Sequence, residues 1–353
     1  MTANGTADFI GDGREPPYRS PYDLLLTPAN TVTPEDVHWL WYPYLPLGKL
    51  CLLGGDPGLG KTWIALGIAA AYSRGQWPFV DPLQPSEQEP GQTLYCASED
   101  GQADTLVPRL KTMGADLDRV IFLEGQKDKK GRLHRIALNE ENILVDAIRQ
   151  TEAKLIIFDP FQRFLPAKTK MNEMETVSPV VTSLMAIAEK SGCTVLLLGH
   201  LNKSKQDTLG YKFIGSVDWF AAARSVLMVM KNPDEPIAGR YLYQIKNSLA
   251  PQANGIGFSL AHGSIPFRWG GATSISAEEM FSPHDGKSKG AKTTAAQMFL
   301  TQELANGERP SEELIEKAKE LDISRRTLFN AKQEMGIKAR KSGFSTHWYW
   351  FLS

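Results

Sequence analysis

Gly55-Asp-Pro-Gly-Leu-Gly-Lys61-Thr62 is the stretch of sequence that decides how this chain folds. Its spacing, G-x-x-x-x-G-K-[ST], is typical of a loop that wraps its backbone around phosphate groups. The glycines allow a tight turn whose N–H groups point inward, Lys61 can reach the β- and γ-phosphates, and Thr62 can offer its hydroxyl to Mg²⁺. The motif therefore predicts a site for a nucleoside triphosphate such as ATP, the alternative being a glycine-rich turn that binds nothing.

The segments on both sides of this loop fit the same prediction. Lys49-Leu-Cys-Leu-Leu53 is an apolar run typical of a buried strand, and Trp63–Tyr72 has the apolar character of a buried helix. Because the helix would begin directly after the loop, its N-terminus would face the phosphates. The predicted nucleotide-contacting residues here are Gly55, Asp56, Pro57, Gly58, Leu59, Gly60, Lys61, Thr62 and Trp63.

Length and composition indicate a globular protein with one large domain or two modest ones. The chain has 353 residues, of which 42% are hydrophobic and 22% charged, so it can bury a sizeable core. Its formal net charge is −1. Bulk charge therefore does not attract a polyanion, and any affinity for nucleic acid has to come from local basic patches.

Three features predict a cytoplasmic protein that makes no use of a membrane. The N-terminal residues have neither the basic nor the apolar region of a signal peptide. No apolar run reaches the roughly 18 residues that a membrane-spanning helix needs. Cys51, Cys96 and Cys193 each lie in an apolar, strand-like run without CxxC spacing, which favours buried thiols in a reducing compartment.

Apolar strands alternate with helices through the middle of the chain. After the first strand, the predicted strands are residues 93–97, 120–123, 154–158, 194–198, 225–230 and 241–245, with helices starting at Asp104, Ile143 and Val177 between them. Strands that are apolar almost throughout are typical of a parallel sheet buried on both faces. The predicted fold class is therefore α/β, with a mainly parallel sheet covered by helices.

Shifts in composition divide the chain into four predicted segments. Residues 1–34 are polar and rich in proline and glycine, which is typical of a loose lead-in, and residues 35–270 hold the predicted sheet. Residues 271–292 are polar and turn-rich like a linker, and residues 293–353 form a separate compact unit. From Lys287 to the end, twelve basic side chains stand against eight acidic ones, so this part is positively charged.

The last segment has the element order of a winged helix. Helices are predicted at residues 295–306, 310–321 and 325–335, and two strands around a turn at residues 337–341 and 346–351. A winged helix inserts its third helix into a nucleic-acid groove. The third helix carries Arg325, Arg326, Asn330 and Lys332, which could contact such a groove. The sequence therefore suggests a DNA-targeting module, and the modest charge leaves docking to a protein open.

Carboxylates follow two of the predicted strands, where a parallel sheet binds ligands. Asp159 ends the strand at residues 154–158 and can hold the Mg²⁺ shell, the alternative being a turn or helix-capping aspartate before Pro160. Glu99 follows the strand at residues 93–97 and can activate or position the attacking water of ATP hydrolysis. Asp100 is the second candidate for that role, and both could instead cap the helix near Asp104.

His200 and the residues after it form the next candidate cluster. His200 ends the strand at residues 194–198, where it can contact the γ-phosphate, although a lone histidine is often structural. The segment at residues 202–213 interleaves Lys203, Lys205 and Lys212 with Tyr211 and Phe213. Cations that follow a phosphate backbone and rings that stack on bases are the ingredients of a single-strand-binding loop. On composition alone, a solvated surface loop fits this segment equally well.

Together these motifs resemble the RecA-like ATPases, in particular the branch that contains the hexameric plasmid replicative helicase RepA. The resemblance spans roughly Trp39 to Trp269. The phosphate loop is common to many families, so the other motifs carry the resemblance. In chain order these are Ala97-Ser-Glu-Asp100, Phe158-Asp-Pro-Phe161, Gly199-His-Leu-Asn-Lys203, Gly215-Ser216, Ala223-Arg-Ser225 and Lys246-Asn247.

The resemblance implies a role for each of these motifs. It makes Glu99 the catalytic carboxylate, Asp159 the Walker B aspartate that shares Mg²⁺ with Thr62, and His200 the γ-phosphate sensor. It also makes Arg224 an arginine finger that reaches the ATP of a neighbouring subunit, and places Lys246 where several relatives carry a second cation acting in trans. The alternative for Arg224 is an arginine at a helix end that pairs with an acid.

The function that the resemblance implies is a Mg²⁺-dependent ATPase acting on DNA. We expect a homo-oligomer, a hexameric ring that passes single-stranded DNA and serves as a replicative helicase of a phage or mobile element. The C-terminal winged-helix-like unit departs from RepA and could bind duplex DNA. Two alternatives remain open: a recombinase or helicase-loader ATPase, and a nucleotide-dependent switch that binds DNA or protein without translocation.

Overall fold

The computed structural model divides the chain into two units, Met1–Val37 and His38–Ser353. It describes residues 25–79, 88–171, 173–200, 217–231, 239–260, 266–273, 275–277, 280, 296–297, 299–304, 307–320, 323–341 and 348–351. The candidate DNA-binding loop at residues 202–213, Gly215-Ser216 and most of the predicted linker lie outside the described residues. In the first unit the described residues include one short 3₁₀ turn, Ala29–Thr31. None of the described helices has the length and apolar character that crossing a membrane requires.

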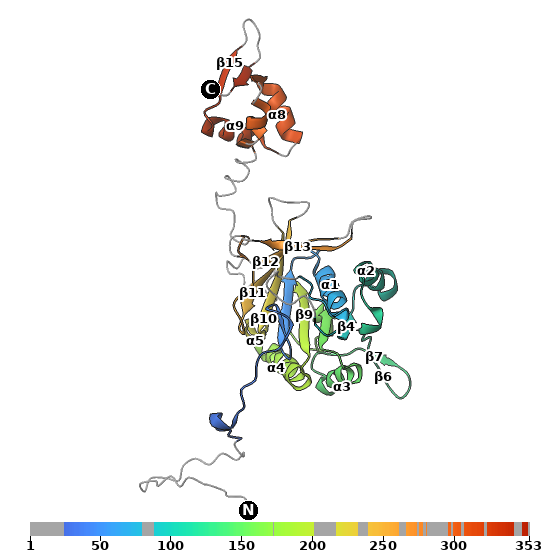
Figure 1. The fold of residues 1–353 in the computed structure, drawn as a ribbon. Helices are drawn as coiled ribbons and strands as arrows, with labels where there is room; N and C mark the ends of the chain where they lie inside the picture. Colours follow the sequence, from blue (N-terminus) through green and yellow to red (C-terminus); the bar gives the residue numbers. More distant parts are fainter. Residues whose placement is uncertain are drawn as a thin grey trace, which may run out of the picture. The chain divides into compact units, whose positions relative to one another are not determined.

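A nine-stranded sheet is the main element of the second unit (Figure 1). Its strands lie in the order β13-β12-β11-β10-β3-β9-β8-β4-β5. They are β3 (Leu50–Gly55), β4 (Thr93–Ala97), β5 (Val120–Phe122), β8 (Leu155–Asp159), β9 (Thr194–His200), β10 (Ser225–Lys231), β11 (Arg240–Asn247), β12 (Gly255–Ser259) and β13 (Arg268–Thr273). The strands from β10 to β5 are parallel, and β11, β12 and β13 extend the sheet in antiparallel pairs.

Helices cover both faces of this sheet (Figure 1). One face carries α1 (Lys61–Ser73) and α2 (Val107–Thr112), and the other carries α3 (Glu141–Thr151), α4 (Met174–Ser191) and α5 (Val217–Ala222). Successive side chains of a strand point to opposite faces. Leu50 and Leu52 therefore pack with α4, whereas Cys51 and Leu53 pack with α1. The predicted α/β fold class is confirmed.

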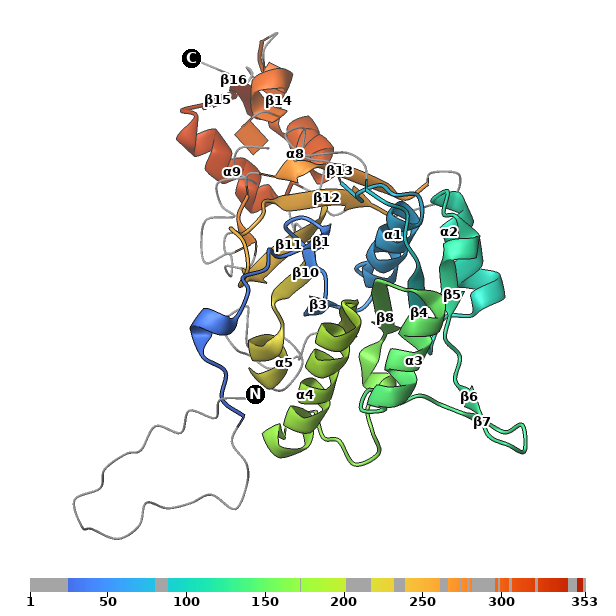
Figure 2. The same ribbon diagram turned by 60° about the horizontal axis from the view of Figure 1, so that its bottom comes forward.

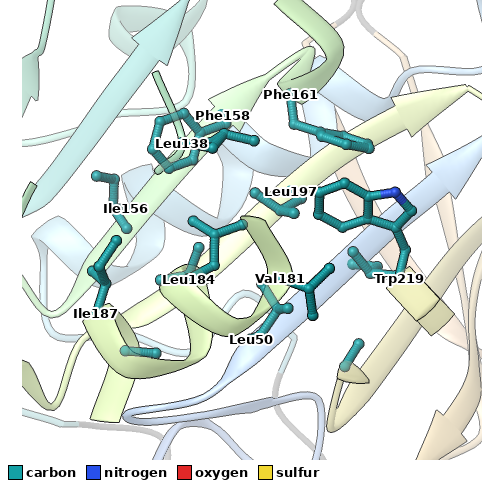
Figure 3. Packing of buried hydrophobic residues seen from close by; sticks show 14 of the residues in the cluster. Leu50, Leu138, Ile156, Phe158, Phe161, Val181, Leu184, Ile187, Leu197 and Trp219 are labelled. Carbon is teal, nitrogen blue, oxygen red and sulfur yellow. The ribbon is translucent and has the colours of Figure 1, made fainter. Parts of the chain in front are cut away.

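Aromatic side chains fix the segment that follows Asp159 to the face covered by α4 (Figure 3). The 3₁₀ turn Phe161–Phe164 begins two residues after β8 ends. Phe161 is fully buried against Trp219, with ring centroids 4.8 Å apart, and Phe164 meets Phe158 edge to face at 5.3 Å. Because both ends of the turn are anchored in the core, Arg163 between them is held at the surface next to the strand ends.

The antiparallel end of the sheet differs from the prediction. The sequence pattern did not indicate β12 and β13, and the predicted linker start at residue 271 is wrong, because β13 runs to Thr273. Farther on, Ala277 and Met280 still pack into the core. Glycines explain why the sequence pattern did not indicate these strands. A Cβ on Gly270 would lie 2.9 Å from the carbonyl oxygen of Gly257, so the backbones of β12 and β13 approach closely at positions without side chains.

The C-terminal residues form a small core of their own. After helical residues at 299–304, β14 (Arg309–Pro310), α8 (Ser311–Glu320), α9 (Arg325–Glu334), β15 (Lys338–Lys341) and β16 (Trp348–Phe351) follow. The three strands pair in the order β14-β16-β15, and Trp350 of β16 is buried together with Leu300, Leu314 and Leu328. The predicted helices and two strands are present and β14 is additional, whereas the winged-helix assignment stays a prediction.

Candidate nucleotide-binding and catalytic site

The phosphate loop connects the end of β3 to the start of α1 and is shaped by its glycines. Gly55, Gly58 and Gly60 have φ values of +152°, +77° and +104°, which L residues rarely adopt. A Cβ on Gly58 would meet nothing within 4 Å, whereas a Cβ on Gly55 would lie 2.8 Å from the carbonyl oxygen of Val229. Gly58 is thus required by its dihedral angle alone, and Gly55 also by the neighbouring strand β10.

Lys61 lies inside the curve of this loop. Its side chain is only 7% exposed, and its ammonium donates to the carbonyl oxygens of Gly55 at 2.8 Å and Asp56 at 2.9 Å. Burial lowers the pKa of Lys61 to about 8, and the charges of Asp159, Asp56 and Glu99 oppose that shift. The lysine is therefore still mostly charged at neutral pH and stands where phosphate oxygens could replace the two carbonyls.

Asp159 and Thr62, the two predicted Mg²⁺ ligands, come together at the end of β8. Asp159 accepts a hydrogen bond from the Tyr95 hydroxyl at 2.7 Å and another from the side chain of Thr62. Burial raises the pKa of Asp159, and these hydrogen bonds limit the rise. A hydroxyl and a carboxylate are hard oxygen donors that suit Mg²⁺, which takes few protein ligands beside phosphate and water. The residues present therefore fit this ion.

Tyr95 is a site residue that the sequence did not indicate. It lies in the middle of β4 and is fully buried, so it looks like an ordinary core residue. Only the pairing of β4 with β8, which puts Ala97 opposite Asp159, brings its hydroxyl to the carboxylate.

Glu99 and Asp100 have different partners. Glu99 Oε1 lies 3.4 Å from Nε of Arg163, and the charge of Glu99 raises the pKa values of both Lys61 and His200. Asp100 instead pairs with Arg109 at 3.1 Å. Within the described residues, neither carboxylate accepts from a backbone N–H of the following helical turn, as the capping alternative required. Of these two carboxylates, Glu99 acts on Lys61 and His200, whereas the charge of Asp100 acts on Asp159.

His200 ends β9 directly beside the start of the loop, because β3 and β9 pair Gly55 with His200. Its Nδ1 lies 3.1 Å from the ammonium of Lys61. Burial and the charge of Lys61 lower the pKa of His200, so the imidazole is neutral at neutral pH. A neutral ring accepts from Lys61 at Nδ1 and keeps its proton at Nε2, which leaves one donor for a ligand.

Trp63 and its neighbours flank the loop on the side of β13. The Trp63 ring stacks on Phe267, with centroids 6.1 Å apart and planes 10° from parallel, and the guanidinium of Arg109 lies 4.7 Å from the Trp63 ring centroid. The sequence did not indicate Phe267 or Arg109, because neither belongs to a recognisable motif. Contact of Trp63 with the nucleotide stays a prediction.

Arg224 and Lys246 lie at the other edge of the sheet. The backbone N–H of Arg224 donates to Leu50, where β3 begins, while the phosphate loop follows the far end of β3 at Gly55. Leu50 and Gly55 are five residues apart along β3, which corresponds to about 16 Å. The ammonium of Lys246 donates to the carbonyl oxygens of Phe220 and Ala221 at 2.8 Å each. Burial lowers the pKa of Lys246, and the charge of Arg224 lowers it further.

The structure therefore separates the predicted site residues into two groups. Lys61, Thr62, Glu99, Asp159 and His200 meet at the carboxyl edge of the parallel strands. Arg224 and Lys246 do not join them within one chain. Arg224 forms no ion pair with any described residue, so the alternative of an arginine paired with an acid finds no partner there.

Comparison with known proteins gives one family and several relatives. The sequence model of a family described as an AAA domain (AAA_25) matches residues 16–206, more than half of the chain. The DNA repair protein RadA of Chlamydia pneumoniae is 28% identical over 158 residues, 44% of this chain and 29% of that protein. RadA of Chlamydia muridarum is 24% identical over the same shares. The chain thus spans less than a third of the length of these curated relatives.

A solved structure with partial similarity is that of a KaiC-like protein from Pyrococcus horikoshii OT3. It is 16% identical, with a TM-score of 0.42, and the match covers 64% of this chain and 90% of that chain.

Proposed function

The chain belongs to the AAA domain family and has a RecA-like P-loop core, and from that premise we propose that it is a Mg²⁺-dependent ATPase acting on DNA. The observation that carries the proposal is the convergence of Lys61, Thr62, Glu99, Asp159 and His200 at one edge of the sheet. These side chains supply a cation, two oxygen ligands, a carboxylate and a neutral imidazole. That set is what phosphoryl transfer to water needs.

Each residue has a separate task in this proposal. Lys61 and the loop N–H groups bind the phosphates, and Thr62 and Asp159 hold Mg²⁺, which when bound neutralises charge on the phosphate oxygens. Glu99 orients the attacking water and takes its proton. His200 contacts Lys61 through Nδ1, so its Nε2–H is available to the γ-phosphate and can report its loss to the loop that follows.

We further propose a ring, a hexamer as the resemblance implies, in which Arg224 and Lys246 act on the ATP of a neighbouring subunit. Arg224 supports this role because its backbone is bonded to the start of β3, about 16 Å along that strand from the phosphate loop of its own chain. Charge donated by a neighbour would make hydrolysis depend on assembly. If the subunits hydrolyse ATP one after another, their DNA-binding loops would move along single-stranded DNA in turn, as in a helicase.

DNA as the partner rests on several supports. The curated relatives are named DNA repair proteins. In the C-terminal unit, which we propose to be a winged helix, Ser324 caps α9 and the exposed Arg325 lies in its first turn. We place α9 in a duplex groove, while docking to a protein remains the second candidate for this unit. The three cysteines are all buried free thiols, which supports a cytoplasmic location.

Unwinding of a forked duplex tests the helicase proposal against its alternatives. We expect the full chain to separate the strands with ATP and Mg²⁺, and Lys61→Ala to fail. Hydrolysis stimulated by DNA without strand separation would favour a recombinase or a helicase loader. Binding of ATP and DNA without stimulated hydrolysis would favour a nucleotide-dependent switch.

A further inference from the structure

A basic hairpin projects beside the catalytic edge of the sheet. It consists of β6 (Gln126–Lys127) and β7 (Leu133–His134), and it extends away from β5 and α3 (Figure 2). Between residues 127 and 135 the chain carries five basic side chains and a single carboxylate, Asp128. Neither the phosphate loop nor the proposed catalytic residues require this charge.

Asp128 stabilises the turn of this hairpin, and the lysines of the hairpin remain exposed. Its carboxylate accepts from the backbone N–H groups of Lys130 at 2.8 Å and Arg132 at 2.9 Å, and from Nε of Arg132 at 2.7 Å. The one negative charge is therefore engaged by Arg132. Lys127, Lys129 and Lys130 are exposed and form no ion pair with any described residue.

A cavity of about 240 Å³ connects the base of the hairpin to the catalytic edge. Its polar lining includes Ser98, Gln102, Glu124, Arg135 and Arg163. The amide of Gln102 donates to the carboxylate of Glu124 at 2.9 Å, which orients this carboxylate and leaves its negative charge in place. Arg135 directly follows β7, is exposed, and makes no ion pair within the described residues. The lining therefore holds two guanidinium groups, those of Arg135 and Arg163, against the single carboxylate of Glu124.

Arg163 belongs to this cavity and also contacts Glu99. Its Nε lies 3.4 Å from Glu99 Oε1, and the two side chains are 61% and 50% exposed. An ion pair this long and this exposed to water is weak. A guanidinium binds a phosphate through two parallel hydrogen bonds, which is a stronger arrangement. A phosphate entering the cavity can therefore take Arg163 from Glu99.

Resting on the proposed ATPase function, we propose that the β6–β7 hairpin and this cavity bind the phosphate backbone of single-stranded DNA, and that a backbone phosphate releases Glu99 from Arg163. Lys127, Lys129 and Lys130 hold the strand, and Arg135 leads it to the cavity. The cavity of about 240 Å³ lies between the base of the hairpin and Arg163, so a strand held by the lysines can place a phosphate there. Glu99, once free, turns to the attacking water, so bound DNA switches hydrolysis on.

The hairpin is tested by DNA binding to the full chain. Anisotropy of a fluorescent oligothymidylate compares wild type, the variant Lys129→Gln/Lys130→Gln, and the matched control Lys111→Gln/Lys154→Gln. The control removes the same charge from exposed sites at the opposite edge of the sheet, where α2 ends and β8 begins. At 0.1 M salt the hairpin variant should bind about 25-fold more weakly, with a log–log salt slope reduced by about 1.4, because each lost phosphate contact contributes about 0.7.

The control variant should match wild type. Equal affinity and equal salt slope in the hairpin variant would overturn the proposal. If the hairpin variant loses affinity for duplex DNA and keeps the wild-type affinity for oligothymidylate, the proposal that the hairpin binds single-stranded DNA is overturned.

The switch is tested by Arg163→Gln and by the milder Arg163→Lys, which keeps the charge and loses the two-pronged geometry. We expect Arg163→Gln to hydrolyse ATP severalfold faster than wild type without DNA and to gain nothing from oligothymidylate, with Arg163→Lys in between. Lower basal hydrolysis with normal stimulation would overturn the switch. Wild type without ATP hydrolysis would instead overturn the proposed function, so the two failures can be told apart.

Discussion

Lys61 combines a buried position with a charge that its proposed task requires. Its pKa is lowered to about 8, so the ammonium is protonated below that pH and is lost as the pH rises through it. ATP affinity should therefore be steady from pH 7 to pH 8 and fall by up to about tenfold for each further pH unit. Calorimetric titration with ATP between pH 7 and 9.5 measures this, and Lys61→Arg, which stays charged, serves as the control. A flat profile in wild type would contradict the account of Lys61.

Glu99 and its neighbour Asp100 offer a matched pair of substitutions. Glu99→Gln preserves shape but removes the charge near Lys61, so ATP should still bind while hydrolysis falls by about 10²- to 10⁴-fold. Asp100→Asn should keep most activity, because Asp100 pairs with Arg109 instead. Single-turnover hydrolysis and ATP affinity, measured on both variants, separate the two effects. If Glu99→Gln hydrolyses at the wild-type rate, Asp100 becomes the candidate.

Residue contacts were only partly predictable from the sequence. The glycines and Lys61 follow from local chemistry, since a loop that cradles phosphate needs those residue types at that spacing. The contacts Tyr95–Asp159, Arg163–Glu99 and Lys61–His200 join residues 64, 64 and 139 positions apart. They depend on strand order and on the packing of the Phe161–Phe164 turn, which no local pattern encodes.

At the scale of elements, strand pairing is what assembles the site. β3 and β9 align Gly55 with His200, and β4 and β8 align Ala97 with Asp159, so polar residues just past these apolar runs meet at one edge. The apolar runs predicted these strands closely. They failed for β12 and β13, where glycines alternate with the buried Ile256 and Phe258 and break up the apolar run.

The loop glycines give a prediction about stability at this scale. Gly58→Ala should destabilise the protein by about 1–2 kcal/mol, the cost of a left-handed backbone for an L residue. Gly55→Ala should cost more, because its Cβ would also lie 2.8 Å from the carbonyl oxygen of Val229 in β10. Chemical denaturation of both variants without nucleotide measures the difference. Equal losses would mean that the β3–β10 contact does not constrain the loop.

For the whole molecule, the proposed ring joins the two edges of the sheet from neighbouring subunits into one site, and this arrangement can be tested by mixing subunits. Arg224→Ala subunits should bind ATP yet leave their neighbour's hydrolysis slower by on the order of 10³-fold, because the transferring phosphoryl group loses a cation. Mixing them with Glu99→Gln subunits should restore part of the activity, since some interfaces then join an intact Glu99 to an intact Arg224. No recovery in rings shown to be mixed would argue against action in trans.

The most direct test of the central claim is the rate of ATP hydrolysis by the full chain with and without single-stranded DNA. The claim predicts Mg²⁺-dependent hydrolysis that Lys61→Ala abolishes and that single-stranded DNA raises severalfold, with less stimulation as salt increases. Hydrolysis that stays the same with and without DNA at every salt concentration, or no hydrolysis at all, would contradict it.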